Sequence, residues 1–224
     1  MGHMGRIRKW REEDAGALWA EARTVLQRGG IMAVPTETFY GLAVDPFQEE
    51  ALVRLFNLKD RPPEKPVLVL VDGQEMLAPL VQEVPEVAAR LMARFWPGPL
   101  TIIFPSRPQL PWRLTGGTGT IGVRQPRQNI TCRLITALKF PITGTSANRA
   151  GCRPCVRAAE VAREFGEQLD LILDAGPCPG GLPSTIVDVT KASPRLVRDG
   201  AIPAAELAEI MPELGRIPAT GGAG

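Results

Sequence analysis

Short apolar runs, each too short for a helix and each bounded by proline, glycine or a polar cluster, recur along the chain. The clearest spans residues 67–71, Val-Leu-Val-Leu-Val, directly after Pro66. Runs of this length that are rich in β-branched residues predict buried strands. Further strands are expected at residues 31–34, 100–104, 120–123, 142–143, 171–173, 184–189 and 195–198.

Segments with apolar residues at helical spacing lie between these runs, at residues 11–29, 51–58, 85–95, 131–139 and 157–169. Strands interleaved with helices predict an α/β fold, in which several connections could equally form antiparallel pairs. The 22 prolines and 23 glycines fall mostly between these elements, which is typical of a site built from many loops on one scaffold.

A length of 224 residues is enough for one well-buried core. We expect a single catalytic domain at residues 5–215, preceded by a cloning remnant at residues 1–4 and followed by a flexible Gly/Ala-rich tail at residues 216–224. No apolar run approaches the roughly 18 residues of a membrane span, and no signal peptide opens the sequence, so we expect a cytoplasmic protein without membrane partners.

The charge balance and the single histidine exclude several classes of protein. The net charge of +2 gives no global argument for a polyanion partner. The only histidine, His3, lies in the remnant, which argues against histidine catalysis and histidine-rich metal sites. Cys152 and Cys155 have the spacing of half a zinc site or of a redox pair, but a second close pair that would complete a zinc site is missing. We therefore predict free thiols and no protein-bound metal.

Two polar clusters lie in the first third of the chain. Residues 35–42 follow a predicted strand, and their threonines and tyrosine could grip a small polar ligand at the carboxyl end of that strand. A helix start with Thr36 as N-cap is the alternative. Residues 59–66 place Lys59, Arg61 and Lys65 on a proline-stiffened loop suited to an anion, and a solvated surface turn is the alternative.

Three further clusters follow. Arg124 closes an apolar strand, where it either pairs with an internal carboxylate or awaits an anionic ligand. Small polar side chains at residues 143–148 flank Gly144 and let the backbone approach phosphate or carboxylate, unless they form a simple polar turn. Ser184 and Arg198 lie at the ends of the last two predicted strands.

Together the clusters predict a site for an anionic ligand beside a small zwitterion. The two commonest nucleotide cradles, the Walker pattern and Gly-x-Gly-x-x-Gly after the first strand, are missing from the sequence. A nucleophile elbow is missing as well, which argues against a hydrolytic triad.

Six motifs in order carry a resemblance that runs from about Gly29 to Ile202. They lie at residues 31–42, 59–62, 95–101, 122–126, 145–148 and 183–188. In this order they resemble the YrdC-type threonylcarbamoyl-AMP synthases. The resemblance implies an open, twisted, mixed α/β sheet with flanking helices and a concave, positively charged face. It also implies that L-threonine, bicarbonate and ATP, with Mg²⁺, are joined into threonylcarbamoyl adenylate and pyrophosphate. A partner transferase complex then uses the adenylate to modify tRNA.

The resemblance also implies roles for individual residues. Threonine would be bound by Thr36, Tyr40, Ser146, Ser184 and Arg124, with the arginine pairing with its carboxylate. The ATP phosphates would meet Lys59, Arg61 and Lys65, and the rest of the nucleotide would meet Thr120, Asn148 and Arg198. Lys59, Arg61 and Arg124 would be the catalytic residues.

The chain departs from the family pattern at several positions. Leu70 stands where some members have histidine, Arg149 and Ala150 replace the usual Leu-Ser, and Val156 stands where a hydroxyl is frequent. The long linker and second domain of larger members have no counterpart, so the sequence resembles the short form.

The expected mechanism is attack of a threonine carbamate on the α-phosphate of ATP, which needs positioning and charge stabilisation more than a proton-transfer residue. Two alternatives remain. The chain could be a double-stranded RNA-binding module, whose affinity would fall steeply with salt. It could also be a carbamoyl-adenylate enzyme that acts on another acceptor, which exchange of threonine for other amino acids would reveal.

Overall fold

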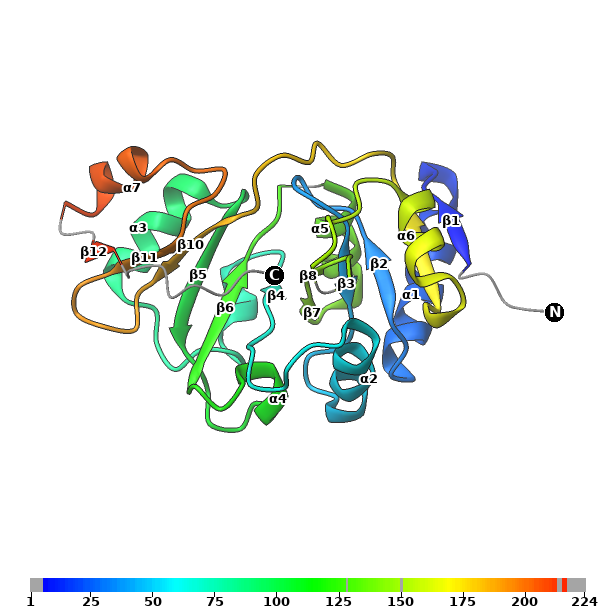
Figure 1. The fold of residues 1–224 in the computed structure, drawn as a ribbon, viewed down its shortest axis with the longest axis horizontal. Helices are drawn as coiled ribbons and strands as arrows, with labels where there is room; N and C mark the ends of the chain where they lie inside the picture. Colours follow the sequence, from blue (N-terminus) through cyan, green and yellow to red (C-terminus); the bar gives the residue numbers. More distant parts are fainter. Residues whose placement is uncertain (1–5, 128, 150, 213–214, 217–224) are drawn as a thin grey trace.

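Two mixed β-sheets form the centre of the protein in a computed structural model, which describes residues 6–127, 129–149, 151–212 and 215–216 (Figure 1). Sheet A has five strands in the order β1 (Ile7–Lys9), β9 (Leu171–Asp174), β2 (Met32–Val34), β3 (Gly41–Ala43) and β8 (Thr145–Ser146). Sheet B has seven strands in the order β12 (Gly215–Arg216), β11 (Arg195–Arg198), β10 (Thr185–Asp188), β5 (Leu100–Pro105), β6 (Thr120–Arg124), β4 (Val69–Leu70) and β7 (Ile142–Thr143).

The central strands of sheet A, β9, β2 and β3, are buried on both faces. One face packs on α1 (Ala15–Gln27) and α5 (Asn129–Leu138), because the apolar stripes of these helices share a cluster with alternate residues of β2 and β9. The other face packs on α2 (Glu49–Lys59) and α6 (Ala158–Phe165). Strands covered on both faces must be apolar throughout, and β2 is fully buried along its length.

Sheet B is apolar on one face along β5 and β6, while Leu70 of β4 and Ile142 of β7 pack from the other face against the cluster of α1 and α5. Leu100, Ile102 and Phe104 of β5 alternate toward α3 (Glu86–Phe95) and α7 (Ala204–Ile210), which lie beside this sheet in Figure 1. The intervening positions of β5 and β6, which include Thr101 and Arg124, therefore fall on the opposite face. This alternation gives sheet B a polar face.

The two sheets meet through consecutive edge strands. Gly144 joins β7, an edge of sheet B, to β8, an edge of sheet A, and its N–H donates to Leu68 O at 2.8 Å. The main chains of Val44 and Thr143 also bond across the junction, at 3.0 Å. Loops from both sheets are brought together here.

The predicted mixed α/β fold is confirmed, with its strands divided between two sheets. The helical alternative at Thr36 is wrong, since residues 35–40 form a turn that leads into β3. Four short strands and two α-helices were not predicted: β1, β3, β8, β12, α7 and α4 (Trp112–Thr115).

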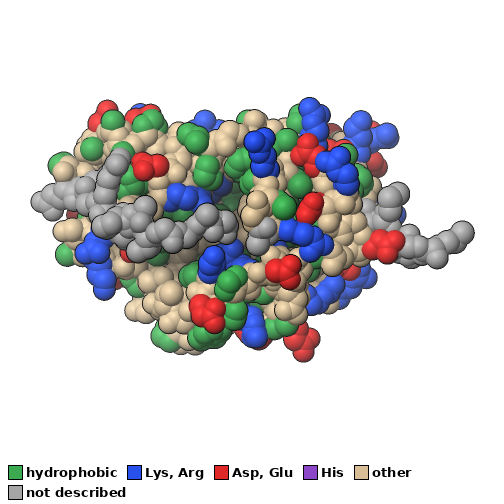
Figure 2. Space-filling model, in the orientation of Figure 1, with side chains coloured by type: hydrophobic (Ala, Val, Ile, Leu, Met, Phe, Trp, Pro, Cys, Tyr) green, Lys and Arg blue, Asp and Glu red, His purple; other side chains and the backbone are tan. Residues whose placement is uncertain are grey.

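The ends of the chain are described only in part. The remnant at residues 1–4 and the tail from residue 217 lie outside the described residues. Arg216, which the sequence analysis assigned to the tail, belongs to β12 and pairs with Leu196 of β11. Among the described helices, none has the length and apolar character needed to cross a membrane. Basic and acidic side chains both lie on the face shown in Figure 2, and the concave positive face stays a prediction.

Candidate functional site

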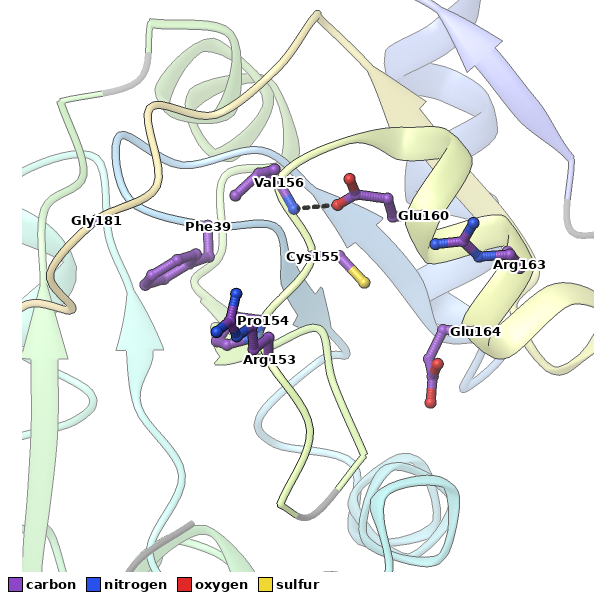
Figure 3. Close-up of a pocket in the computed structure, with 9 residues that line it drawn as sticks. All are labelled: Phe39, Arg153, Pro154, Cys155, Val156, Glu160, Arg163, Glu164 and Gly181. Carbon is purple, nitrogen blue, oxygen red and sulfur yellow. Dashed lines mark hydrogen bonds between the residues drawn. The ribbon is translucent and has the colours of Figure 1, made fainter.

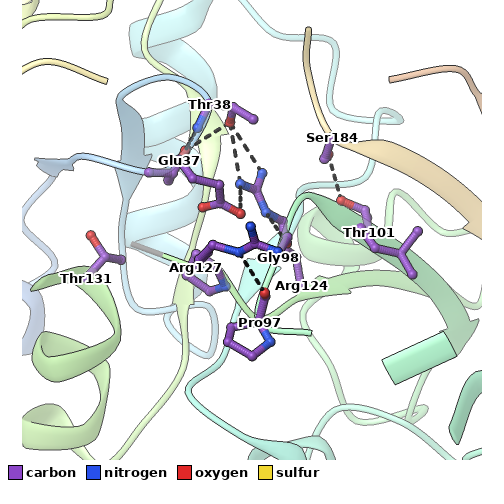
Figure 4. A network of polar contacts seen from close by, with 12 residues as sticks. Glu37, Thr38, Pro97, Gly98, Thr101, Arg124, Arg127, Thr131 and Ser184 are labelled. Carbon is purple, nitrogen blue, oxygen red and sulfur yellow. Dashed lines mark hydrogen bonds and ion pairs between the residues drawn. The ribbon is translucent and has the colours of Figure 1, made fainter. Parts of the chain in front are cut away.

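Arg124 lies where the two sheets meet. It ends β6 of sheet B, and its side chain reaches the turn that follows β2 of sheet A (Figure 4). One terminal nitrogen, Nη2, lies 2.7 Å from Glu37 Oε1, and both terminal nitrogens lie 3.5 Å from Thr38 Oγ1. Nε donates to Gly98 O at 3.2 Å. A guanidinium only 4% exposed is thus held between the sheets by a carboxylate, a hydroxyl and a carbonyl.

Thr36 shapes the turn that presents Glu37 and Thr38. Its Oγ1 accepts from the N–H groups of Thr38 and Phe39 at 3.2 Å each, and it lies 2.7 Å from Phe39 O. The hydroxyl is therefore used within the turn, and Thr36 is buried. In this arrangement Thr36 positions its neighbours, and the side chains that reach Arg124 are those of Glu37 and Thr38.

Ser184 lies on the polar face of sheet B, directly before β10, and β5 separates it from Arg124 of β6. Its hydroxyl lies 2.9 Å from Thr101 Oγ1, and its carbonyl accepts from Arg198 Nη2 at 2.8 Å. The pKa of Arg198 is lowered, first by desolvation and then by the positive charge of Arg124. The charge of Arg124 is therefore felt at the Arg198 guanidinium.

Lys59 forms a second cationic centre at the end of α2. Its Nζ donates to Ser146 O and, at 2.7 Å, to Asn148 O. Burial, followed by the nearby charge of Arg61, lowers the pKa of Lys59 from its ordinary 10.5 to about 8. The Ser146 hydroxyl bonds to Asn148 Oδ1 at 2.6 Å, so Lys59, Ser146 and Asn148 form one unit. β8 pairs with Gly41, which places this unit next to the Thr36 turn.

Four predicted residues do not point into these clusters. Arg61 folds back on its own loop, donating to Lys65 O at 3.2 Å and Pro66 O at 2.6 Å, and the Lys65 side chain is exposed. Tyr40 is fully buried with its hydroxyl on Gly176 O at 2.9 Å, and burial raises its pKa. Thr120 begins β6, at the opposite end from Arg124, and bonds to Thr118.

An open groove of about 690 Å³ adjoins the Thr36 turn (Figure 3). Phe39, Val156 and Gly181 line one part, and Arg153, Glu160 and Arg163 line another. Its wall includes Cys155, whose N–H donates to Ala147 O beside Ser146. The groove therefore lies between Phe39 of the Thr36 turn and α6.

Sequence reasoning did not assign site roles to Glu37, Thr101 and Gly98, and it included Thr38 only as one of the threonines of residues 35–42. Glu37 and Thr38 lie in the motif at residues 35–42, and Thr101 ends the motif at residues 95–101, so the motifs contained the signal. Residue type alone does not decide which hydroxyl shapes a turn and which faces a ligand.

Comparison with known proteins agrees with this architecture. Residues 24–200 match the Sua5/YciO/YrdC family, described as "Telomere recombination". The threonylcarbamoyl-AMP synthase of Pyrococcus abyssi is 36% identical over 97% of the chain, and the chain spans 62% of that relative's length. The synthase of Thiobacillus denitrificans is 37% identical over 73% of the chain and 87% of its own length.

Solved structures show the same fold. Sua5 of P. abyssi, solved in complex with L-threonine, superposes with a TM-score of 0.89 at 35% identity, covering 95% of this chain and 62% of that one. YciO of Escherichia coli gives 0.80 at 26% identity, covering 90% and 98%. By sequence and by structure, the chain belongs to the Sua5/YciO/YrdC family.

Proposed function

We propose that this protein is a threonylcarbamoyl-AMP synthase, which joins L-threonine, bicarbonate and ATP into threonylcarbamoyl adenylate and pyrophosphate. The arrangement that carries the proposal is the buried guanidinium of Arg124 at the junction of the two sheets. Its Nε is engaged by Gly98 and its Nη2 by Glu37, while Nη1 makes only the 3.5 Å contact with Thr38 among the described residues. A desolvated guanidinium with N–H groups to spare suits a carboxylate.

The reaction begins when the neutral amine of threonine attacks carbon dioxide, which bicarbonate supplies, and loses a proton to give a carbamate. A carbamate oxygen then bonds to the α-phosphorus of ATP, and the bond from that phosphorus to the oxygen bridging the β-phosphate breaks. Pyrophosphate carries away the bonding electrons. The carbamate, ATP and pyrophosphate are all anionic, so fixed positive charge stabilises the transition state of the phosphorus step.

Three groups in this chain supply that charge and the positioning. Arg124 holds the threonine carboxylate, with Ser184 and Arg198 beside it on the polar face of sheet B. Lys59 lies at the other side of the Thr36 turn, next to Ser146 and Asn148, and faces the phosphates. Arg61 would have to leave its contacts with Lys65 O and Pro66 O to join them.

Magnesium would arrive with the nucleotide as MgATP, and the residues fit that arrangement. Cationic side chains, rather than a set of carboxylates, surround the proposed phosphate position, and the described residues contain no group of three or more His, Cys, Asp or Glu side chains suited to a metal. Phosphate oxygens are ligands that Mg²⁺ prefers. The bound ion would offset charge on the β- and γ-phosphates.

The proposal covers residues 5–215 as one catalytic domain. Transfer of the product to tRNA by a separate transferase complex, direct binding of tRNA or double-stranded RNA, and a cytoplasmic location stay predictions.

The test is pyrophosphate release by the full chain with ATP, bicarbonate and one amino acid at a time, with mass spectrometry of the adenylate. We expect release that depends on threonine. Arg124→Lys, which cannot reproduce the guanidinium fork, should lower kcat/KM for threonine roughly 10- to 150-fold, equivalent to about 1.5–3 kcal/mol.

Arg133→Lys is the matched control, because Arg133 pairs with Glu12 on the outer side of the protein and should leave the rate unchanged. Equal turnover with any amino acid would favour the other-acceptor alternative. Salt-sensitive RNA binding without nucleotide turnover would favour the RNA-binding alternative.

A further inference from the structure

Glu37 is a buried carboxylate whose hydrogen-bonding capacity is not met. Its side chain is 14% exposed, and both carboxylate oxygens are inaccessible and have no hydrogen-bond partner among the described residues. Oε1 makes the 2.7 Å ion pair with Arg124, without the alignment of a hydrogen bond. A buried carboxylate normally accepts several hydrogen bonds, because desolvated charge without donors is costly.

Arg124 and Glu37 therefore present adjacent positive and negative groups with capacity left on both. The guanidinium has five N–H donors. Its contacts with Gly98 O and Glu37 Oε1 are 3.2 and 2.7 Å long, but both contacts with Thr38 Oγ1 are 3.5 Å long, so some donors have no close acceptor among the described residues. The carboxylate has about four acceptor positions. Figure 4 shows the Glu37 carboxylate, from the turn after β2, directed toward the Arg124 guanidinium at the end of β6.

We propose that Glu37 accepts the α-ammonium group of the substrate in the initial complex, before that group loses a proton and the neutral amine attacks carbon dioxide, so that the Glu37–Arg124 pair recognises an α-amino acid as a zwitterion. This inference rests on the proposed function and adds a specificity-determining residue to it. The substrate carboxylate joins Arg124, and the substrate ammonium donates to Glu37. The two ligand charges then complete a network of four alternating charges.

The geometry favours this role over a purely structural ion pair. A pair that served only to orient Arg124 would gain most from two parallel hydrogen bonds, the fork arrangement that arginine and carboxylate commonly adopt. Here Arg133 and Glu12 form such a fork, at 2.7 and 2.6 Å, whereas Glu37 meets Arg124 through one oxygen. Arg124 is also oriented independently, by Gly98 O and by burial.

Removing the charge of Glu37 should therefore affect ligands that carry an ammonium group and spare those that lack it. The two probes are L-threonine and (R)-3-hydroxybutyrate, which has the same carboxylate and hydroxyl but no amine. Binding of each to the full chain is measured by calorimetry, for wild type and for Glu37→Gln.

We expect Glu37→Gln to weaken threonine binding roughly 10- to 150-fold, the range for a lost charge-assisted hydrogen bond. The same substitution should leave 3-hydroxybutyrate unchanged or slightly tighter, because a negative group next to its carboxylate is gone. Glu21→Gln is the control. Glu21 lies on α1 and pairs with Arg8 of β1 at 2.7 Å, so this substitution should alter neither affinity. Glu37→Asp, which keeps the charge, should retain a preference for threonine, and it gives a second test if Glu37→Gln folds poorly.

Equal losses for both probes in Glu37→Gln would mean that Glu37 only positions Arg124, and would overturn this inference alone. Loss of the threonine preference in Glu37→Asp would also count against it. Wild-type protein that binds no threonine would refute the proposed function itself.

Discussion

Replacing Lys59 by methionine separates what the buried lysine does for stability from what it does for function. Lys59 is 6% exposed, and its pKa is lowered to about 8, chiefly by burial. Since one pKa unit is worth about 1.4 kcal/mol, keeping Lys59 charged in the folded protein costs about 3 kcal/mol. Methionine has similar volume and carries no charge, so the substitution removes this cost.

The same substitution removes a donor from two carbonyls. Ser146 O keeps a hydrogen bond from Asn148 N at 3.0 Å, whereas Asn148 O loses the 2.7 Å bond from Lys59. One unsatisfied carbonyl costs about 1–3 kcal/mol. At pH 7 the two effects oppose each other, and we expect the free energies of unfolding of Lys59→Met and wild type to agree within about 2 kcal/mol.

The pH dependence has a definite sign. Because the folded pKa lies below the unfolded value of 10.5, the unfolded chain binds more protons between about pH 8 and pH 10.5. The free energy of unfolding of wild type minus that of Lys59→Met should therefore rise by up to about 3 kcal/mol across this range. The thiols titrate in the same range and are common to both proteins, but the charge of Lys59 lowers the pKa of Cys155, so Cys155→Ser is introduced into both proteins before they are compared.

Urea denaturation at half-unit pH steps measures the difference, and pyrophosphate release measures function. We expect Lys59→Met to lose roughly 10- to 150-fold in kcat/KM for ATP while remaining folded. A stability difference that stays flat from pH 7 to pH 10.5 would show that Lys59 is not held charged against a burial cost. Unchanged turnover would show that it does not face the phosphates.

The Gly144–Leu70 contact and the four cysteines give two further, independent predictions. A Cβ added at Gly144 would lie 2.5 Å from Leu70 Cγ, so Gly144→Ala should lower the free energy of unfolding, measured by urea denaturation, by about 1–3 kcal/mol. In a Leu70→Ala background the same substitution should cost less, because the clashing side chain is gone. Equal costs in both backgrounds would contradict the contact. Cys152 is exposed, Cys132 is half-buried, and Cys155 and Cys178 are buried. Burial raises the pKa values of Cys132, Cys155 and Cys178 to about 11. A thiol reagent at pH 8 should therefore label Cys152 quickly, Cys132 more slowly, and Cys155 and Cys178 only in denaturant. Rapid native labelling of all four would refute the burial.

The sequence predicted the long periodic elements well and the short ones poorly. Residues 85–95 and 100–104 were expected as helix and strand, and they match α3 and β5 closely. β3 and β8 have only three and two residues, and neither is enriched in apolar β-branched side chains. Such strands are held by pairing with neighbours distant in sequence, which local propensity does not encode.

Thr36 illustrates why a local pattern can mislead. A threonine whose hydroxyl accepts from the second and third following N–H groups is what a helix N-cap provides, and Thr36 makes both of these bonds. The chain nevertheless continues into β3, because Gly41 to Ala43 pair with β2. The same hydrogen bonds serve a helix start or a tight turn, and the non-local pairing decides between them.

The candidate site was predictable as a set of motifs but not as a set of contacts. Arg124 was left with two alternatives, an internal carboxylate or an anionic ligand, and the structure satisfies the first through Glu37. The two need not exclude each other, because one guanidinium has enough donors for both. An incompletely used carboxylate beside an incompletely used guanidinium is costly to bury without a ligand. A zwitterion that supplied the missing donor and acceptor would offset this cost in one step, so binding at the junction should stabilise the contact between the two sheets as well as select the ligand.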